Sequence, residues 1–163
     1  MFEIGDKVVF GTDGVCVVDA VGSIDMEGVS KDKIYYTLTP LGKIGNNHIF
    51  APVESKRVVM RKILTPDDAK ALLSRIKEIE PLEVPDVRKR EDTYKAVLQS
   101  CDCTKLIQLL KEIHGRKLAR NAAGKKLPSV DERYYTMAEN ALCSELSFPL
   151  GKGKDEVKDI IVL

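Results

Sequence analysis

The chain has 163 residues, of which 44% are hydrophobic and 31% are charged, and its formal net charge is +1. This length accommodates one domain or two small ones, and the composition is ordinary for a soluble globular protein. No apolar run approaches the ~20 residues of a membrane-spanning helix, and the start, MFEIGDKVVF, lacks the basic region of a secretion signal. We therefore expect a cytoplasmic protein whose cysteines stay reduced.

Residues 1–64 are predicted to form a small β domain. Short segments rich in β-branched and aromatic residues alternate with turn signals such as GTDG and MEGVSKDK. Five short strands at this spacing are typical of an SH3- or Tudor-like barrel, and Gly22 is expected to mark a bulge or bend. The predicted barrel core consists of Val8, Phe10, Val17, Tyr35, Leu38, Ile49, Val58 and Ile63.

The segment HIFAP, residues 48–52, is the best candidate for an exposed sheet edge. Pro52 lacks an N–H group, so it belongs at a strand end or on an edge. An exposed edge can accept a strand from a partner protein. The aromatic residues of this region, such as Tyr35 and Phe50, are explained equally well as core residues.

Residues 65–163 are predicted to form a helical domain of four to five helices, which makes the chain an α+β protein with its domain boundary near Leu64. The first helix has a natural N-cap in Thr65 and a proline, Pro66, that suits the first helical position. Pro81 is expected to end this helix.

The later helices also have start and stop signals in the sequence. Asp102 is expected to cap the third helix, which Gly124 ends, and Ser129 with Glu132 forms a potential capping box for the fourth. Apolar residues at helical spacing define the predicted core: Ala69, Leu72, Leu73, Ile76, Ile79, Tyr94, Val97, Leu98, Cys101, Leu106, Leu109, Leu110, Ile113, Val130, Tyr134, Met137, Ala138, Ala141 and Leu142.

Catalytic motifs are missing from the sequence. No GK pair has the spacing of a phosphate-binding loop, and Cys101 and Cys103 lack further metal ligands at suitable spacing. Acidic neighbours such as Asp131 and Glu132 are best explained as complements of a helix dipole. We expect no enzymatic activity, metal, cofactor or small-molecule substrate. The alternative is an enzyme that uses Cys103 or Cys143, which an unusually reactive thiol would support.

Basic residues are concentrated in residues 111–126, which hold six Lys or Arg and one acidic residue. Lys and Arg that bind phosphates give salt-sensitive nucleic-acid binding, and helix ends can add further basic residues to this stretch. A solvated helix face and a protein-binding surface are the alternatives. The candidate DNA-binding residues are Arg88, Lys89, Arg90, Lys95, Arg116, Lys117, Arg120, Lys125, Lys126 and Arg133.

The opening FEIGDKVVFGTDGVCVVDAV resembles the N-terminal signature of the CarD/CdnL family of bacterial transcription regulators. The matching residues are Gly5, Asp6, Val8, Val9, Gly14 and Val17, with Phe10 in place of a Tyr and Asp13 in place of a His. Further matches are Pro52, Arg61 and the pair Tyr94–Lys95, and KKLPSVDERYYTMAENALCSEL resembles the family's last long helix. The resemblance covers about residues 1–148.

This resemblance implies a Tudor-like head that pairs its sheet edge with the β subunit of RNA polymerase, and a helical body that contacts promoter double-stranded DNA. Such regulators have no catalytic activity and tune the stability of the open complex, including at ribosomal RNA promoters, so the protein is expected on the nucleoid with RNA polymerase. The implied polymerase-binding residues are Ile24, Asn47, His48, Ile49, Phe50, Ala51 and Pro52.

The chain departs from the family pattern at several positions. The family places a Trp four residues before its YK pair, where this chain has Arg90, and the adjoining basic residues are here Asp92 and Thr93. The family's polymerase-facing arginines align with Ile24 and Phe50. We interpret the chain as a divergent member in which Arg90 contacts the minor groove or a phosphate. The alternative is a protein-interaction adaptor with the same head and no functional DNA contact.

Overall fold

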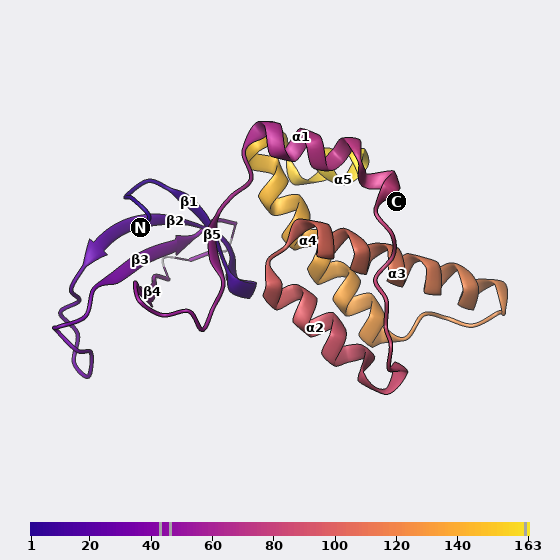
Figure 1. The fold of residues 1–163 in the computed structure, drawn as a ribbon, viewed down its shortest axis with the longest axis horizontal. Helices are drawn as coiled ribbons and strands as arrows, with labels where there is room; N and C mark the ends of the chain where they lie inside the picture. Colours follow the sequence, from indigo (N-terminus) through magenta and orange to yellow (C-terminus); the bar gives the residue numbers. More distant parts are fainter. Residues whose placement is uncertain (43, 46, 162) are drawn as a thin grey trace. The chain divides into compact units, whose positions relative to one another are not determined.

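The structure is a computed structural model that describes residues 1–42, 44–45, 47–161 and 163. The chain forms two compact units, Met1–Ile63 and Leu64–Leu163, which we call the head and the body. Within the described residues, the head is a five-stranded antiparallel sheet and the body contains five α-helices (Figure 1). The predicted α+β class, with a β head followed by a helical body, is confirmed.

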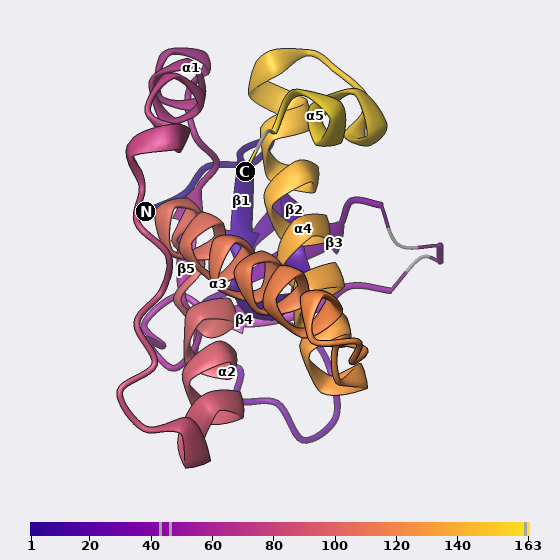
Figure 2. The same cartoon turned by 90° about the vertical axis from the view of Figure 1, so that its right-hand side faces the viewer.

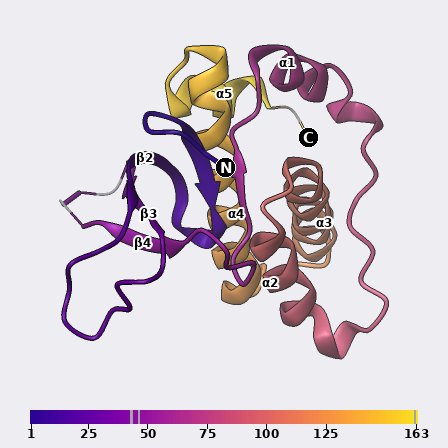
Figure 3. The same cartoon turned by 60° about the vertical axis from the view of Figure 1, so that its left-hand side comes forward.

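The strands of the head are β1 (Lys7–Phe10), β2 (Gly14–Gly22), β3 (Tyr35–Pro40), β4 (Ile49–Pro52) and β5 (Met60–Lys62). Their order in the sheet is β4-β3-β2-β1-β5, so β4 and β5 are its two edges. Figure 3 shows β4 beside β3 and β3 beside β2. This order places the HIFAP segment at an edge, as the sequence predicts.

The main buried cluster of the head lies on one face of the sheet, whereas Val9 and Val15 are buried on the opposite face. The main cluster contains Val8, Cys16, Val18, Tyr36, Leu38 and Ala51. The prediction is confirmed for Val8 and Leu38, and Phe10 and Ile49 pack against this core while they remain partly exposed.

The predicted core of the head is wrong at Val17, Tyr35 and Val58. The side chains that point inward are those of the sequence neighbours of Val17 and Tyr35. Because successive side chains of a strand point to opposite faces, an assumed register that is off by one residue exchanges the two faces. Val58 is 42% exposed, and Ile63 also lies outside this core.

The helices of the body are α1 (Pro66–Ser74), α2 (Arg90–Ser100), α3 (Cys103–Ala122), α4 (Ser129–Leu150) and α5 (Lys154–Ile160). The predicted cap of α1 is confirmed, because Thr65 accepts a hydrogen bond from the backbone N–H of Asp68 at 3.1 Å. Asp102 caps α3 in the same way. Helices α2, α3 and α4 pack against one another (Figure 2).

Helix α1 ends at Ser74, well before the predicted stop at Pro81. A short 3-10 turn follows, and Lys111 of α3 donates hydrogen bonds to the carbonyl oxygens of Ile76 and Ile79, at 2.5 and 2.6 Å. The distant helix α3 thus provides a side-chain donor to the segment that follows α1, and this contact leaves no signal in the local sequence.

Helix α4 begins without the predicted capping box. Ser129 is its first helical residue, Pro128 takes the N-cap position, and no side chain caps the helix there. The prediction that Ser129 and Glu132 cap α4 is therefore wrong. Proline fits this position because it removes a backbone N–H that would lack a partner at the start of a helix.

The buried face of α4 is only partly the predicted one. Tyr134, Ala138 and Leu142 are buried as predicted, whereas Val130, Met137 and Ala141 are exposed. Two acidic residues, Asp131 and Glu145, take buried positions on this helix with 3% and 2% exposure. Glu145 accepts hydrogen bonds from the backbone N–H of Leu64 at 2.9 Å and from the Cys103 thiol at 3.2 Å.

Two substitutions on α4 test which face is buried. Leu142→Ala is expected to lower the free energy of unfolding by about 2–5 kcal/mol, because it opens a cavity at a fully buried position. Met137→Ala is the matched control, and it should change this free energy by no more than about 0.5 kcal/mol because Met137 is 43% exposed. Urea unfolding measures both, and equal losses would contradict the assigned face.

Candidate functional site

The first candidate site is the outer side of the edge strand β4. Val53 donates a backbone hydrogen bond to the carbonyl of Ile34 at 3.0 Å, just beyond the paired strands. Because N–H and C=O groups alternate in direction along an antiparallel strand, those of Ala51 face β3 and those of Phe50 face away. Pro52 also faces away, so its missing N–H removes no hydrogen bond from the sheet.

The side chains of the predicted polymerase-binding segment are mixed in burial. Ala51 is buried and Ile49 packs against the head core, whereas Phe50 is 40% exposed and the remaining side chains of the segment are exposed. The exposed members are Asn47, His48, Phe50 and Pro52. Ile24 follows the end of β2, which β3 separates from β4, so Ile24 is not part of this edge.

A polar cluster that sequence reasoning missed lies beside the start of β4. The Thr39 hydroxyl donates a hydrogen bond to Asp19 and lies 3.2 Å from Nδ1 of His48. The same nitrogen lies 3.8 Å from Oδ2 of Asp19. The bulge of β2 falls at Asp19, between Val18 and Ala20, and not at Gly22 as predicted. The cluster therefore holds His48 directly before the edge strand.

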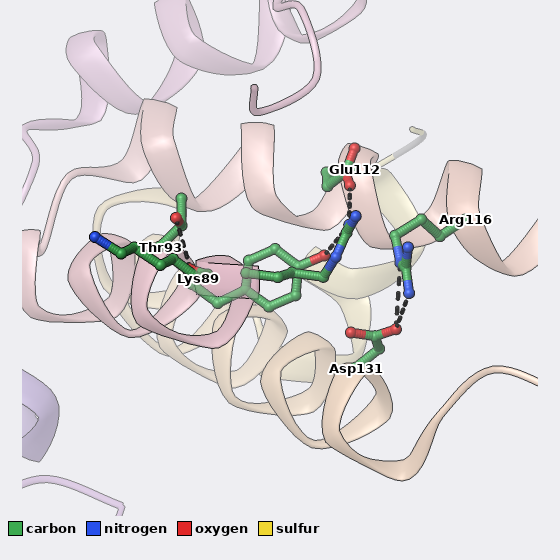
Figure 4. Close-up of polar contacts among 7 residues, drawn as sticks. Lys89, Thr93, Glu112, Arg116 and Asp131 are labelled. Atoms are coloured by element: carbon green, nitrogen blue, oxygen red, sulfur yellow. Dashed lines mark hydrogen bonds and ion pairs between the residues drawn. The ribbon is translucent and has the colours of Figure 1, made fainter. Parts of the chain in front are cut away.

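Arg90, a predicted DNA contact, is held by other residues of the body. Its guanidinium lies 2.7 Å from Oε1 of Glu112 and donates to the Tyr94 hydroxyl at 3.3 Å (Figure 4). The Arg90 side chain is only 18% exposed. Contact with a phosphate would require this partly buried pair to break and leave Glu112 without its cation. This placement disagrees with the predicted DNA contact, so we leave Arg90 out of the proposed DNA surface.

Two further arginine–carboxylate pairs join the same helices. Arg116 of α3 donates from Nε and Nη2 to Oδ2 of Asp131 in α4, at 3.3 and 3.0 Å (Figure 4). Arg133 of α4 donates to Oε1 of Glu91 in α2 at 3.0 Å, and the Tyr134 hydroxyl donates to the same oxygen at 3.2 Å. Together with Arg90–Glu112, these pairs connect α2 to α3, α3 to α4 and α4 to α2.

The three pairs bring the start of α2, the second half of α3 and the start of α4 to one end of the body. Most of the predicted DNA-binding residues lie in these segments, and we call the exposed ones together with Arg120 the basic end. It consists of Arg88, Lys89, Lys117, Arg120, Lys125, Lys126 and Arg133. Arg120 is tied locally, because its Nε donates to the carbonyl of Lys126 at 2.7 Å. The basic end leaves out two predicted residues: Lys95, which is exposed further along α2, and Arg116, which is paired with Asp131.

The structure gives no support to the thiol-enzyme alternative. Cys103 and Cys143 are buried, and burial raises the pKa of the Cys143 thiol to about 11, so that this thiol is protonated at neutral pH. A nucleophilic cysteine needs an accessible thiolate. Among the described residues, no three His, Cys, Asp or Glu side chains are grouped as metal ligands would be, and no helix has the length and apolarity to cross a membrane.

The buried pair of Asp131 and Arg116 is expected to matter more for stability than the exposed pair of Glu91 and Arg133. Asp131→Asn leaves Arg116 without its carboxylate and should lower the free energy of unfolding by about 3 kcal/mol. Glu91→Gln should lower it by less than about 1 kcal/mol, because both side chains of that pair are more than half exposed. Thermal and urea unfolding measure the two variants, and a larger loss for Glu91→Gln would contradict this ranking.

Comparison with known protein families identifies the head. Residues 2–64 match the family model described as the CarD-like/TRCF RID domain. The matched range spans all five strands of the head. No curated protein matches the chain. The resemblance seen in the opening sequence is confirmed by this match over residues 2–64, and the head therefore belongs to the CarD-like/TRCF family of RNA-polymerase-interacting domains, with a Tudor-like fold.

Proposed function

We propose that this protein is a non-enzymatic transcription regulator that binds the β subunit of RNA polymerase through β4 and contacts promoter DNA through the basic end of the body. In this proposal it acts in the cytoplasm with RNA polymerase on the nucleoid, and it tunes the stability of the open complex. The observation that carries the proposal is an RNA-polymerase-interacting domain whose edge strand directs its unpaired backbone groups away from the sheet.

Strand addition at β4 is supported by the backbone geometry. The N–H and C=O of Phe50 face away from β3, so a partner strand can exchange both hydrogen bonds with this residue. The backbone supplies these bonds whatever the side chain is. The edge can therefore pair even though Ile24 and Phe50 replace the arginines that the family resemblance implies.

The body supports a second, weaker contact. The basic end carries exposed cations, and phosphate contacts by such residues are independent of base sequence. Binding of the head to polymerase raises the effective concentration of the body at the promoter. A DNA contact that favours the open complex by ~1.4 kcal/mol then shifts the closed-to-open equilibrium tenfold.

The alternative function is a protein-interaction adaptor whose body does not bind DNA. The observation in its favour is that Arg90, Arg116 and Arg133 already pair with carboxylates of the body. The acidic residues Asp92 and Glu132 are exposed on the first turns of α2 and α4 and reduce the positive charge nearby.

Phe50→Pro tests polymerase binding at β4. The substitution removes the outward N–H, leaves the hydrogen bonds to β3 in place, and should weaken binding to the purified polymerase β subunit about tenfold to a hundredfold. Phe50→Val keeps the N–H and suits a strand, so it should bind within about threefold of the parent chain. A pull-down and a titration measure this difference, and unchanged binding by Phe50→Pro would exclude β4 as the docking edge.

A triple substitution at the basic end tests DNA binding. Changing Lys117, Lys125 and Lys126 to Gln should weaken binding to duplex DNA and lower the steepness of its salt dependence by about one unit per lost phosphate contact. The control changes Lys152 and Lys154, which are exposed outside the basic end. Fluorescence anisotropy at several salt concentrations measures both, and a parent chain that binds polymerase but shows no salt-sensitive DNA binding would establish the adaptor alternative.

A further inference from the structure

We propose that β4 also pairs with β4 of a second copy of this chain, in an antiparallel dimer whose two-fold axis passes beside Phe50. The proposal starts from the contrast between the two edges of the sheet. Exposed edge strands are commonly protected from pairing by charged side chains, prolines or bulges. Strand β4 has one of these features, Pro52, whereas β5 has charged side chains.

Strand β5 has such protection. It includes Arg61 and Lys62, and Lys56 and Arg57 lie shortly before it, so a second copy of this edge would meet like charges. The segment from Asn47 to Val53, which includes β4, carries no acidic residue, lysine or arginine. The bulge of the sheet lies in β2, an inner strand, where it does not disturb pairing at β4.

The backbone of β4 is complementary to itself about Phe50. In an antiparallel pair with two-fold symmetry, Phe50 faces Phe50 of the second copy, and the two residues exchange both backbone hydrogen bonds. If the alternation is continued by two residues, the N–H of His48 meets the carbonyl of Pro52 in the second copy. The absent N–H of Pro52 then faces only the His48 carbonyl. The register thus has four backbone hydrogen bonds, and proline lies where its missing donor matters least.

The side chains suit the same register. Phe50 is 40% exposed on the outer face of the sheet, and across the axis it would lie beside its own copy. Two aromatic rings at this separation bury apolar surface that is otherwise in contact with water. His48 faces Pro52 and not a second His48, so the register does not place two imidazole rings opposite each other.

Self-pairing and polymerase binding would exclude each other, because both use the outer side of β4. This consequence rests on the proposed function, whereas the dimer itself does not. A rising concentration of the chain would then divert molecules into dimers and lower the share available to polymerase. The dimer is therefore tested without polymerase, so that its failure and the failure of the proposed function can be told apart.

A charge exchange at Phe50 tests the dimer. In sedimentation equilibrium, the mass of the parent chain should rise with concentration from 18.1 kDa towards twice that value. Phe50→Lys and Phe50→Glu each place two like charges across the axis, and each should weaken self-association at least about tenfold. An equimolar mixture of the two variants places opposite charges there and should restore dimers. No surface other than one that faces itself at Phe50 predicts this rescue.

Several results would overturn the proposal. The parent chain could stay monomeric at its highest soluble concentration. The two variants could associate as strongly as the parent chain, or their mixture could remain monomeric. Lys62→Pro serves as the control at the opposite edge and should leave dimerisation unchanged, whereas loss of dimers in this variant alone would assign the contact to β5.

Hydrogen exchange of the parent chain tests the same contact without a substitution. The amide of Phe50 should become protected as the concentration rises, because it enters an intermolecular bond. The amide of Ala51 faces β3 and should be protected at every concentration. Equal protection of the Phe50 amide in dilute and concentrated samples would overturn the proposal even if the variants fail to fold.

Discussion

An open antiparallel sheet leaves one row of backbone donors and acceptors without partners along each edge, and this constraint shapes the head. The strand order places β4, which presents the backbone groups of Phe50 outward, at one edge and β5, which carries basic side chains, at the other. A buried polar group without a partner is costly, whereas an exposed one can bind water or a new strand. The choice of β4 for self-pairing follows from the absence of charged side chains there.

In the body, ion pairs between side chains join three helices at an end that is rich in charge. Arg90, Arg116 and Arg133 each pair with a carboxylate of a neighbouring helix, so the cations that the sequence offers for DNA are divided into two groups. One group stabilises the body, and the other, mainly lysines, remains exposed. Arg133 belongs to both groups, because it pairs with Glu91 while its side chain is 60% exposed. Lysine is a flexible point charge and arginine a planar donor that suits bidentate pairing, which agrees with this division.

Local signals in the sequence predict much of this fold, and long-range contacts explain where prediction fails. The caps at Thr65 and Asp102 bond backbone groups only a few residues away, so the local sequence predicts them, and both are confirmed. The inward faces of β2 and β3 depend on strand register, so Val17 and Tyr35 were assigned to the wrong side. Asp131 was explained only as a complement of the helix dipole, because the sequence does not reveal its ion pair with Arg116 on another helix. The edge position of HIFAP could be predicted from Pro52, whereas the engagement of Arg90 by Glu112 could not.

The contact between Lys111 and the segment that follows α1 also has a consequence for the order in which the body folds. The ammonium group that binds the carbonyl oxygens of Ile76 and Ile79 lies 35 and 32 residues further along the chain. Local hydrogen bonds are sufficient for α1 and the short 3-10 turn after it, but they do not supply the contact from α3. That contact forms only after α3 has formed and docked, because closing so long a loop precedes the gain from the contact. During synthesis, the segment after α1 would therefore leave the ribosome before the helix that binds it.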